Sequence, residues 1–222
     1  MTRIALIHAL AHSVAPINDE MDRAWPECRR MNLLDDSLSA DLARSGRGLD
    51  AAMHARFETL TAYAEGTGAQ GILFTCSAFG PCIEAAAARR PHMPVLKPNE
   101  AMVADAVQAG RRIGLIASFA PTLQSMPPEF PDTVQVLPRL ADGAMQALDE
   151  GRAQAHDEAV LLAAQALLAQ GCDVIALAQF SMARAAPLLR RQMPQQVPVL
   201  TTPGSAVRVL RERIQGASRL SR

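Results

Sequence analysis

A cysteine stands at the tip of a sharp turn in residues 71–86, GILFTCSAFGPCIEAA. An apolar run ends at Phe74, small residues follow it, and an alanine-rich stretch then has the composition of a helix. A strand–turn–helix unit leaves N–H groups unpaired where the helix begins, and these groups favour an anion such as a carboxylate. The same field is expected to lower the pKa of the Cys76 thiol, which would then serve as a base or a nucleophile.

The other three cysteines are expected to be structural. Cys82 falls inside the following helix, Cys172 precedes a strand, and Cys28 lies near the start of another strand. The sequence has no C-x-x-C pair and no cysteine–histidine cluster with zinc spacing. We therefore expect free thiols and no metal site.

The surroundings of Cys76 recur in the second half of the chain. Residues 68–78, GAQGILFTCSA, match residues 171–181, GCDVIALAQFS, at an offset that places Cys76 on Gln179. The segments MPVLKP and VPVLTTP follow at nearly the same offset, and RIALI at 3–7 matches RIGLI at 112–116. Three matching blocks in the same order indicate an internal duplication.

Short apolar strands alternate with helical stretches along the whole chain. The expected strands are 3–10, 29–35, 71–75, 93–98, 111–118, 133–138, 173–179 and 197–203. The expected helices are 39–66 with a break near 46–48, 81–90, 99–110, 156–171, 183–192 and 204–216. The proline-rich segment 119–132 is expected to be mostly irregular.

This alternation predicts an α/β fold with two similar halves, residues 1–110 and 111–222. Each half is expected to run β-β-α-β-α-β-α, with a mostly parallel four-stranded sheet flanked by helices. The halves would be related by a pseudo-two-fold axis, and the C-terminal helix would pack back on the first half. Ligands of open α/β sheets bind at the carboxyl ends of the strands, so we expect the active site in a cleft between the halves.

Composition excludes several classes of function. Lys+Arg and Asp+Glu are both 22, so the net charge is zero and no basic face indicates a nucleic-acid partner. No apolar run approaches the ~18 residues of a membrane span, and the N-terminus lacks the apolar core of a signal peptide, so a cytoplasmic protein is expected. The glycine pattern at 66–71 ends a helix and enters a strand, which is the wrong context for a dinucleotide fingerprint.

The segments FTCSAFGP and DVIALAQFSMARA, in mirrored places of a duplicated chain, resemble the aspartate/glutamate racemase superfamily. Its relatives include hydantoin racemase, maleate isomerase and arylmalonate decarboxylase. The resemblance implies catalysis without a cofactor or a metal, on the carbon next to a carboxylate of a small amino acid or organic acid. It implies that two cysteines face each other across the substrate, and Cys76 matches the first of them.

The chain departs from the family pattern at the second cysteine. The expected Leu-Gly-Cys-x-x-Met is here LAQFSM, residues 177–182, with Gln179 at the cysteine position. An amide hydrogen-bonds but does not transfer protons at a useful pKa, which argues against a symmetric two-thiol racemase. Besides Cys76 and Gln179, the expected substrate-binding residues are Thr75, Ser77, Ala78, Ser118, Thr122, Phe180 and Ser181. Weaker candidates are His8, His12 and Lys97. Phe79, Phe180 and Met182 would line a dry pocket.

Four functions stay open on this sequence. The first is an isomerase with Cys76 as acid and base, and the second is a single-cysteine decarboxylase in which Cys76 donates one proton. The third is a cysteine hydrolase or amidase, which needs His8 or His12 as the partner of the thiol. The fourth is a non-catalytic protein that binds a carboxylate. The substrate and the oligomeric state, a homo-oligomer included, are left open.

Overall fold

The chain folds into two compact α/β units. The computed structural model describes the backbone of residues 1–220 and the side chains of residues 1–216. The first unit comprises Met1–Pro98 together with the helical segment from Ala206 on, and the second unit comprises Asn99–Ser205. The division therefore lies between Pro98 and Asn99, about one helix earlier than the expected boundary at residue 110.

The described part of the first unit contains four strands, four α-helices and part of a fifth. The strands are β1 (Arg3–His8), β2 (Arg29–Leu34), β3 (Gly71–Phe74) and β4 (Val95–Leu96). The α-helices are α1 (Val14–Ala24), α2 (Ser37–Ser45), α3 (Ala51–Gly66), α4 (Gly80–Ala88) and the main part of α10 (Thr202–Leu220), with the 3-10 helices η1 (Ala11–Ser13) and η2 (Ser77–Phe79).

The second unit repeats this plan. Its strands are β5 (Arg112–Ala117), β6 (Gln135–Leu140), β7 (Val174–Leu177) and β8 (Val199–Thr201). Its α-helices are α5 (Glu100–Ala109), α6 (Ala120–Ser125), α7 (Ala144–Asp149), α8 (Ala153–Ala169) and α9 (Ala186–Gln192), with the 3-10 helices η3 (Pro127–Glu129) and η4 (Phe180–Ala185). Helix α10 begins at the end of this unit.

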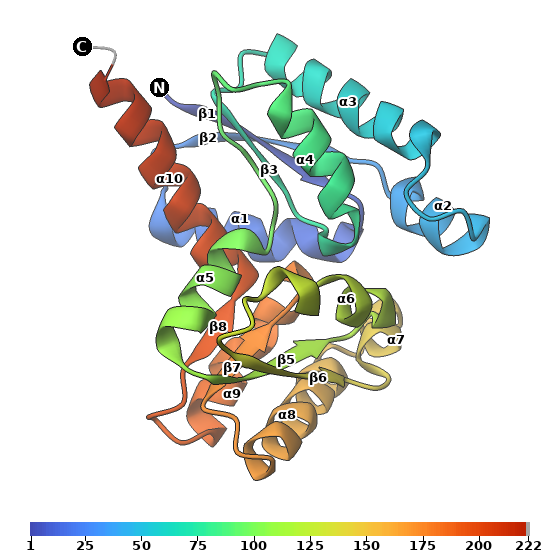
Figure 1. Ribbon diagram of the computed structural model, residues 1–222, viewed down its shortest axis with the longest axis vertical. Helices are drawn as coiled ribbons and strands as arrows, with labels where there is room; N and C mark the ends of the chain where they lie inside the picture. The colour runs from blue at the N-terminus through green and yellow to red at the C-terminus, as the bar shows by residue number, and fades with distance from the viewer. Residues whose placement is uncertain (221–222) are drawn as a thin grey trace. The chain divides into compact units, whose positions relative to one another are not determined.

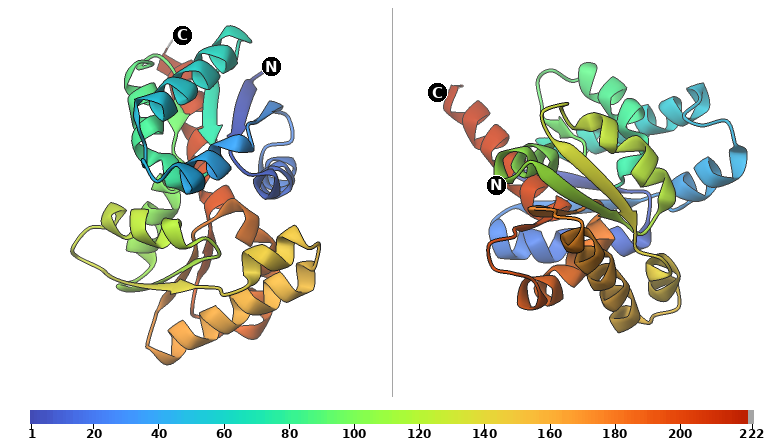
Figure 2. Two further views of the ribbon diagram at one scale, coloured as in Figure 1. Left: turned by 90° about the vertical axis from the view of Figure 1, so that its right-hand side faces the viewer. Right: turned by 60° about the horizontal axis from the view of Figure 1, so that its bottom comes forward.

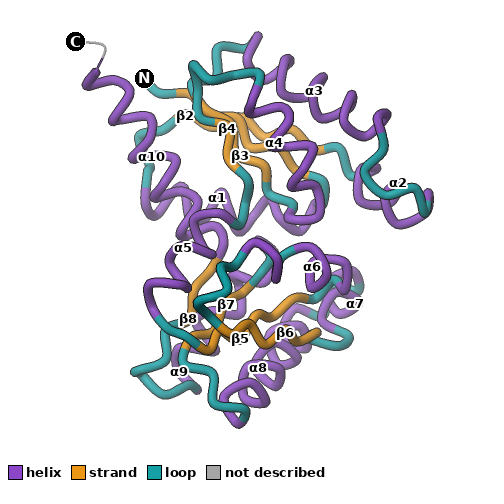
Figure 3. The backbone as a smooth tube through the Cα atoms, viewed as in Figure 1, coloured by secondary structure: helices purple, strands orange, loops and turns teal. Residues whose placement is uncertain are grey.

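The two sheets have the same topology. Their strand orders are β2-β1-β3-β4 and β6-β5-β7-β8, and every pair of neighbouring strands is parallel. The colours and labels of Figure 1 and the strand trace in Figure 3 let the reader follow each sheet. The predicted α/β class with two four-stranded sheets is confirmed, and the sheets are wholly parallel.

The expected β-β start of each half is wrong. Parallel neighbours cannot be joined by a tight hairpin and need a crossover connection. Helix α1 supplies this crossover between β1 and β2, and α6 supplies it between β5 and β6. Helix α6 lies inside the segment 119–132 that was expected to be irregular. Its proline, Pro121, stands in the first turn of the helix, where no backbone N–H is required.

Each sheet is covered by helices on both faces, as Figures 1 and 2 show within each unit. Helices α2, α3 and α4 enclose the larger core of the first unit, where Phe57 stacks on Phe74 with ring centroids 5.1 Å apart. In the second unit, α7, α8 and α9 cover one face and α5 and α6 the other. Because both faces are buried, the central strands are continuous apolar runs.

Helix α10 packs on the sheet of the first unit through Gly71 at the start of β3. A Cβ atom added to Gly71 would stand 2.8 Å from Cδ1 of Ile214 and 3.2 Å from Cδ1 of Leu210. Leu210 is fully buried and Ile214 nearly so. The absence of a side chain at residue 71 therefore lets α10 approach the sheet closely.

We predict that Gly71→Val destabilises the first unit by roughly 1–3 kcal/mol, because the added methyl groups overpack the contact with Ile214. Unfolding in urea, followed by the fluorescence of Trp25, measures the loss, since Trp25 is the only tryptophan and belongs to this unit. Adding Ile214→Ala should recover part of the loss. Equal or additive destabilisation in the double variant would contradict this packing.

Candidate active site

The carboxyl ends of the central strands place Cys76 and Gln179 at equivalent points of the two sheets. In the first unit the last paired residues of β1 and β3 are Ile7 and Phe74, and Cys76 stands two residues later. In the second unit β5 and β7 end their pairing at Ile116 and Leu177, and Gln179 stands two residues later. Both residues have extended backbones and directly precede a 3-10 helix, η2 or η4.

Cys76 is a half-buried thiol with two hydrogen-bond partners. The backbone N–H of Ala78 donates to its sulfur. The Oγ atom of Ser39, in the first turn of α2, lies 4.0 Å from Sγ. The side chain also packs against the apolar core of the first unit. The thiol thus lies between the polar turn at Ala78 and the apolar core of the first unit.

The expected lowering of the Cys76 pKa is wrong. Burial raises the pKa of this thiol, and the bonds from Ala78 and Ser39 only partly oppose the rise. The reason is that the sulfur does not sit on the first turn of α4, which begins at Gly80. Two donors do not outweigh removal of the thiolate from water. Near neutral pH, Cys76 is therefore a protonated thiol in the ligand-free protein.

His8 ends β1 and belongs to a buried polar network. Its Nδ1 lies 2.9 Å from the hydroxyl of Thr75, and its Nε2 lies 2.9 Å from Oδ1 of Asn32. The same Oδ1 accepts a bond from Nδ2 of Asn18 at 3.0 Å. Because an amide oxygen only accepts, the proton of the neutral ring is on Nε2 and Thr75 donates to Nδ1. Burial lowers the pKa of His8, although its bond with Asn32 opposes the shift.

This network fixes Thr75 beside Cys76 and does not activate the thiol. Both ring nitrogens of His8 are engaged by Thr75 and Asn32, and the imidazole is fully buried. A hydrolase needs a histidine within hydrogen-bond distance of its nucleophile. His8 acts here as a positioning residue for the turn that carries Cys76.

Gln179 is held by three donors of the second unit. Its Oε1 accepts hydrogen bonds from the N–H of Ser118 at 2.6 Å, the hydroxyl of Ser118 at 3.0 Å and the N–H of Phe119 at 3.2 Å. These donors follow β5 directly, so the Gln179 side chain joins the ends of two neighbouring strands. Three donors on one atom also settle which side-chain atom is the oxygen.

The other expected binding residues lie near these two points within their own units. Thr75, Ser77, Ser118 and Thr122 are buried, Ala78 is half-buried, and Thr122 lies in the first turn of α6. Phe180 and Ser181 are buried in η4, and no described residue bonds to the Oγ of Ser181.

The weaker candidates are engaged elsewhere or only partly accessible. The ammonium group of Lys97 is 2.5 Å from the carboxylate of Glu84 on α4. His12 lies in η1 and is half-buried.

The expected dry pocket of large apolar side chains is wrong for Phe79 and Met182, and its third member, Phe180, is fully buried as well. Phe79 is fully buried and its ring centroid lies 4.9 Å from that of Phe57 in the core of the first unit. Met182 is fully buried in the core of the second unit. These side chains stabilise the units and do not line an open pocket.

The remaining three cysteines are free and buried, as expected. Burial raises the pKa of Cys28 and of Cys82 to about 11, and it also raises the pKa of Cys172. Partial exposure of the residue at a strand end distinguishes Cys76 from them. Among the residues described, no cluster of three or more His, Cys, Asp or Glu side chains suits a metal ion.

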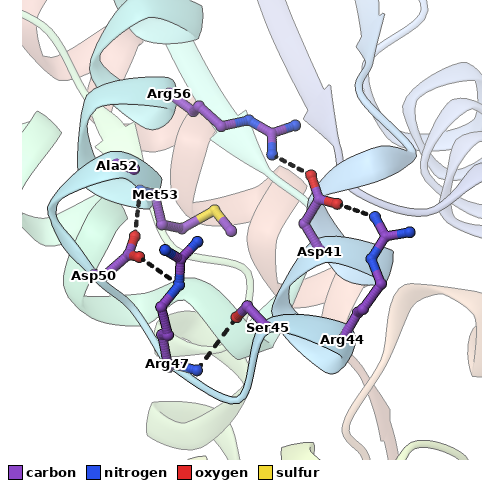
Figure 4. A pocket seen from close by; sticks show the side chains of 9 residues that line it. Asp41, Arg44, Ser45, Arg47, Asp50, Ala52, Met53 and Arg56 are labelled. Carbon is purple, nitrogen blue, oxygen red and sulfur yellow. Dashed lines mark hydrogen bonds and ion pairs between the residues drawn. The ribbon is translucent and has the colours of Figure 1, made fainter.

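A separate polar pocket of about 380 Å³ opens between the end of α2 and the start of α3 (Figure 4). Its charged side chains pair with one another, Arg44 and Arg56 with Asp41, and Arg47 with Asp50. Cys76 is not part of its lining. The lining therefore carries three arginines against two aspartates, and Arg56 also pairs with Asp35 outside the lining.

The sequence model of the Asp/Glu/Hydantoin racemase family matches residues 14–210. The chain belongs to this family. Such a match over most of the chain makes the protein a racemase-like enzyme and leaves its reaction open. A search of curated protein sequences finds no significant match.

Solved racemase structures share the fold of this racemase-family protein. Glutamate racemase RacE1 from Bacillus anthracis has a TM-score of 0.76 at 14% identity, covering 97% of this chain and 82% of the other. Aspartate racemase from Picrophilus torridus gives 0.72 at 12% identity, covering 98% and 95%. Allantoin racemase from Klebsiella pneumoniae gives 0.68 at 20% identity, covering 100% and 89%.

Sequence reasoning missed three side chains of this racemase-family site. Ser39 is 37 residues from the thiol that it contacts, and Asn18 and Asn32 are distant from Thr75 in the chain. Only the strand order brings them together. A usable signal existed for Asn32 alone, a polar residue between Met31 and Leu33 in a strand.

We predict that Ser39→Ala slows alkylation of Cys76 by iodoacetamide about two- to fivefold at neutral pH. Loss of the hydroxyl removes a bond that stabilises the thiolate, so the pKa of Cys76 rises further and the thiolate fraction falls. Peptide mapping by mass spectrometry follows Cys76 separately from the buried cysteines. Faster alkylation with an unchanged pH profile would show that Ser39 only shields the sulfur.

We predict that His8→Gln weakens the acid sensitivity of the first unit. The folded-state pKa of His8 is lowered, so the unfolded chain takes up the proton first as the pH falls below about 6.5. The stability that depends on neutral His8 is present above that pH and decreases toward the lowered pKa, by at most about 1.4 kcal/mol per pH unit. Urea unfolding followed by Trp25 at several pH values should show a smaller slope for the variant. An identical slope would contradict the assignment.

Proposed function

We propose that this protein is a cofactor-independent isomerase that acts on the carbon next to a carboxylate of a small amino acid or organic acid. Cys76 is its acid and base. Family membership and the position of the Cys76 sulfur support the proposal. Cys76 is a half-buried residue at the carboxyl end of a central parallel strand, which is where ligands of such sheets bind.

The proposed reaction begins when the Cys76 thiolate removes the proton from the α-carbon. The C–H bond breaks, the proton moves to Sγ, and the electron pair spreads into the carboxylate as an enediolate. We expect backbone N–H groups of the turn, such as that of Ser77, to stabilise this charge, each by on the order of 3 kcal/mol. The N–H of Ala78, which donates to Sγ in the ligand-free protein, would support the thiolate. Return of a proton to the carbon regenerates the thiolate.

The raised pKa of Cys76 favours a second candidate, a decarboxylase. A protonated thiol is the state that a proton donor requires, and burial holds Cys76 in that state near neutral pH. In this reaction the bond between the α-carbon and one carboxylate breaks. Carbon dioxide leaves, and the electron pair of the bond stays on the α-carbon. The resulting enediolate then takes the proton of Sγ. One thiol is sufficient for this sequence, so Gln179 needs to transfer no proton.

The substrates named for the relatives give the first test. We predict that the protein exchanges the α-hydrogen of an enantiomer of aspartate or glutamate in deuterium oxide, or releases carbon dioxide from an aryl- or alkylmalonate. Cys76→Ser should reduce either activity at least about 100-fold, because a hydroxyl is too weak an acid to replace the thiol. Cys82→Ala, a change six residues away inside α4, is the matched control and should retain turnover. Proton NMR of recovered substrate and product measures both outcomes.

The pH profile separates the two candidates. Proton abstraction needs the thiolate, so its rate should rise with pH toward the raised pKa of Cys76. Proton donation needs the thiol, so decarboxylation should be constant near neutral pH and fall above that pKa. Full activity in Cys76→Ser would rule out both. Saturable binding of a carboxylate without turnover of any compound would instead identify a binding protein.

A further inference from the structure

Among the described residues, none forms a hydrogen bond with the amide nitrogen of Gln179. All three bonds of Gln179 within the described residues go to Oε1. Nε2 is also absent from the buried polar atoms that lack a partner, so solvent reaches it. The N–H₂ group therefore presents two donors to solvent from a side chain whose rotation is fixed at its other end.

Because Oε1 of Gln179 is held by three donors, only the N–H₂ end of the amide can face a ligand. A free glutamine can turn either end of its amide toward a ligand. Here, turning Oε1 outward would cost three hydrogen bonds and leave the N–H groups of Ser118 and Phe119 without an acceptor. The side chain is consequently a preorganised donor at the carboxyl edge of the second sheet, with no matching capacity to accept.

The loop that follows Gln179 carries a second polar group without a protein partner. Ser181 is 1% exposed, and its Oγ bonds to none of the described residues. Buried hydroxyls are rarely left without a partner, so an unpaired one beside a strand end points to a missing ligand or ordered water. Neither the amide nor the hydroxyl ionises near neutral pH.

We propose that Gln179 is a specificity-determining residue that donates a hydrogen bond from Nε2 to a carboxylate oxygen of the ligand. This inference rests on the proposed function, since it concerns the same substrate. It assigns binding to the loop of Gln179 and Ser181, and it leaves the transfer of protons to Cys76. Gln179 selects for an acceptor and against a cationic group at this point of the ligand.

Gln179→Glu is the sharpest test, because it keeps the held oxygen and reverses the polarity of the other atom. The carboxylate still accepts from Ser118 and Phe119, with stronger charge-assisted bonds, so thermal stability should be unchanged or higher. The outward atom becomes an anionic acceptor that repels a carboxylate. Calorimetric titration with malonate, L-aspartate and L-glutamate should therefore show an affinity about 10- to 100-fold weaker than that of the unaltered protein.

Gln179→Met is the matched control, because it removes the hydrogen bonds that Oε1 accepts. It keeps the length of the side chain but leaves the N–H groups of Ser118 and Phe119 without their acceptor. We expect it to lose affinity and also to lower the unfolding temperature. Loss of affinity with intact stability in Gln179→Glu, against loss of both in Gln179→Met, separates the role of Nε2 from that of Oε1.

A measurement on the unaltered protein keeps the proposal testable if a variant does not fold. In protein labelled with nitrogen-15 glutamine, the N–H₂ signals of Gln179 are those that disappear in the Gln179→Glu spectrum or, failing that, in the Gln179→Met spectrum. They should shift saturably with the same carboxylates and not with sodium chloride at equal ionic strength. Equal affinity in Gln179→Glu, or the absence of any saturable shift up to the solubility limit, overturns the proposal.

The two proposals fail in different ways. Cys76→Ser should bind the carboxylates as the unaltered protein does, because Nε2 of Gln179 is untouched. Turnover that survives in Cys76→Ser contradicts the proposed function and leaves the role of Gln179 intact. Binding that survives in Gln179→Glu contradicts the role of Gln179 and leaves Cys76 as the proton carrier.

Discussion

The site depends on the register between the two central strands of each sheet. In one unit, the pairing of β1 with β3 ends at Ile7 and Phe74. In the other unit, the pairing of β5 with β7 ends at the equivalent residues, Ile116 and Leu177. A slip of one residue would turn each side chain to the opposite face of its sheet. Register is strongly specified here because both faces of each sheet are buried. The positions of Cys76 and Gln179 are thus fixed by the pairing of apolar residues in buried strands.

Burial then gives the two strand ends different chemical capacities. In the first unit it disfavours the thiolate of Cys76 more than the donors from Ala78 and Ser39 stabilise it. The thiol is held protonated but close to groups that would support the charge once a substrate displaces water. In the second unit the buried donors at the end of β5 meet a neutral amide oxygen, and no titratable group is created. The thiol of Cys76 is thus suited to carrying a proton, and the neutral amide of Gln179 is suited to hydrogen bonding with a ligand.

Local sequence patterns predict much of the fold, but they predict only part of the candidate site. The alternation of apolar runs and the repeat of residues 68–78 at 171–181 predict the class and place Cys76 opposite Gln179 in the pattern. The crossover helices α1 and α6 were not predicted. The prolines of 119–132 favour irregular structure when position is ignored, although Pro121 occupies a permitted first-turn position.

The electrostatics of the site could not be read from local sequence at all. The pKa of Cys76 depends on burial by segments far along the chain and on Ser39 in α2, and the engagement of His8 depends on Asn32 of the neighbouring strand. The orientation of Gln179 depends likewise on residues some sixty positions earlier. Each is a long-range consequence of strand order, which no short motif encodes.

We propose above all that Cys76 transfers a proton to or from the α-carbon of a carboxylate substrate. A crystal structure of Cys76→Ser with a bound carboxylate substrate tests it most directly, because the substrate is held and not consumed. We expect the α-carbon to lie about 3.5 Å from the Oγ of the introduced serine. A ligand bound only in the arginine-lined pocket between α2 and α3, with the turn of Cys76 empty, would contradict it.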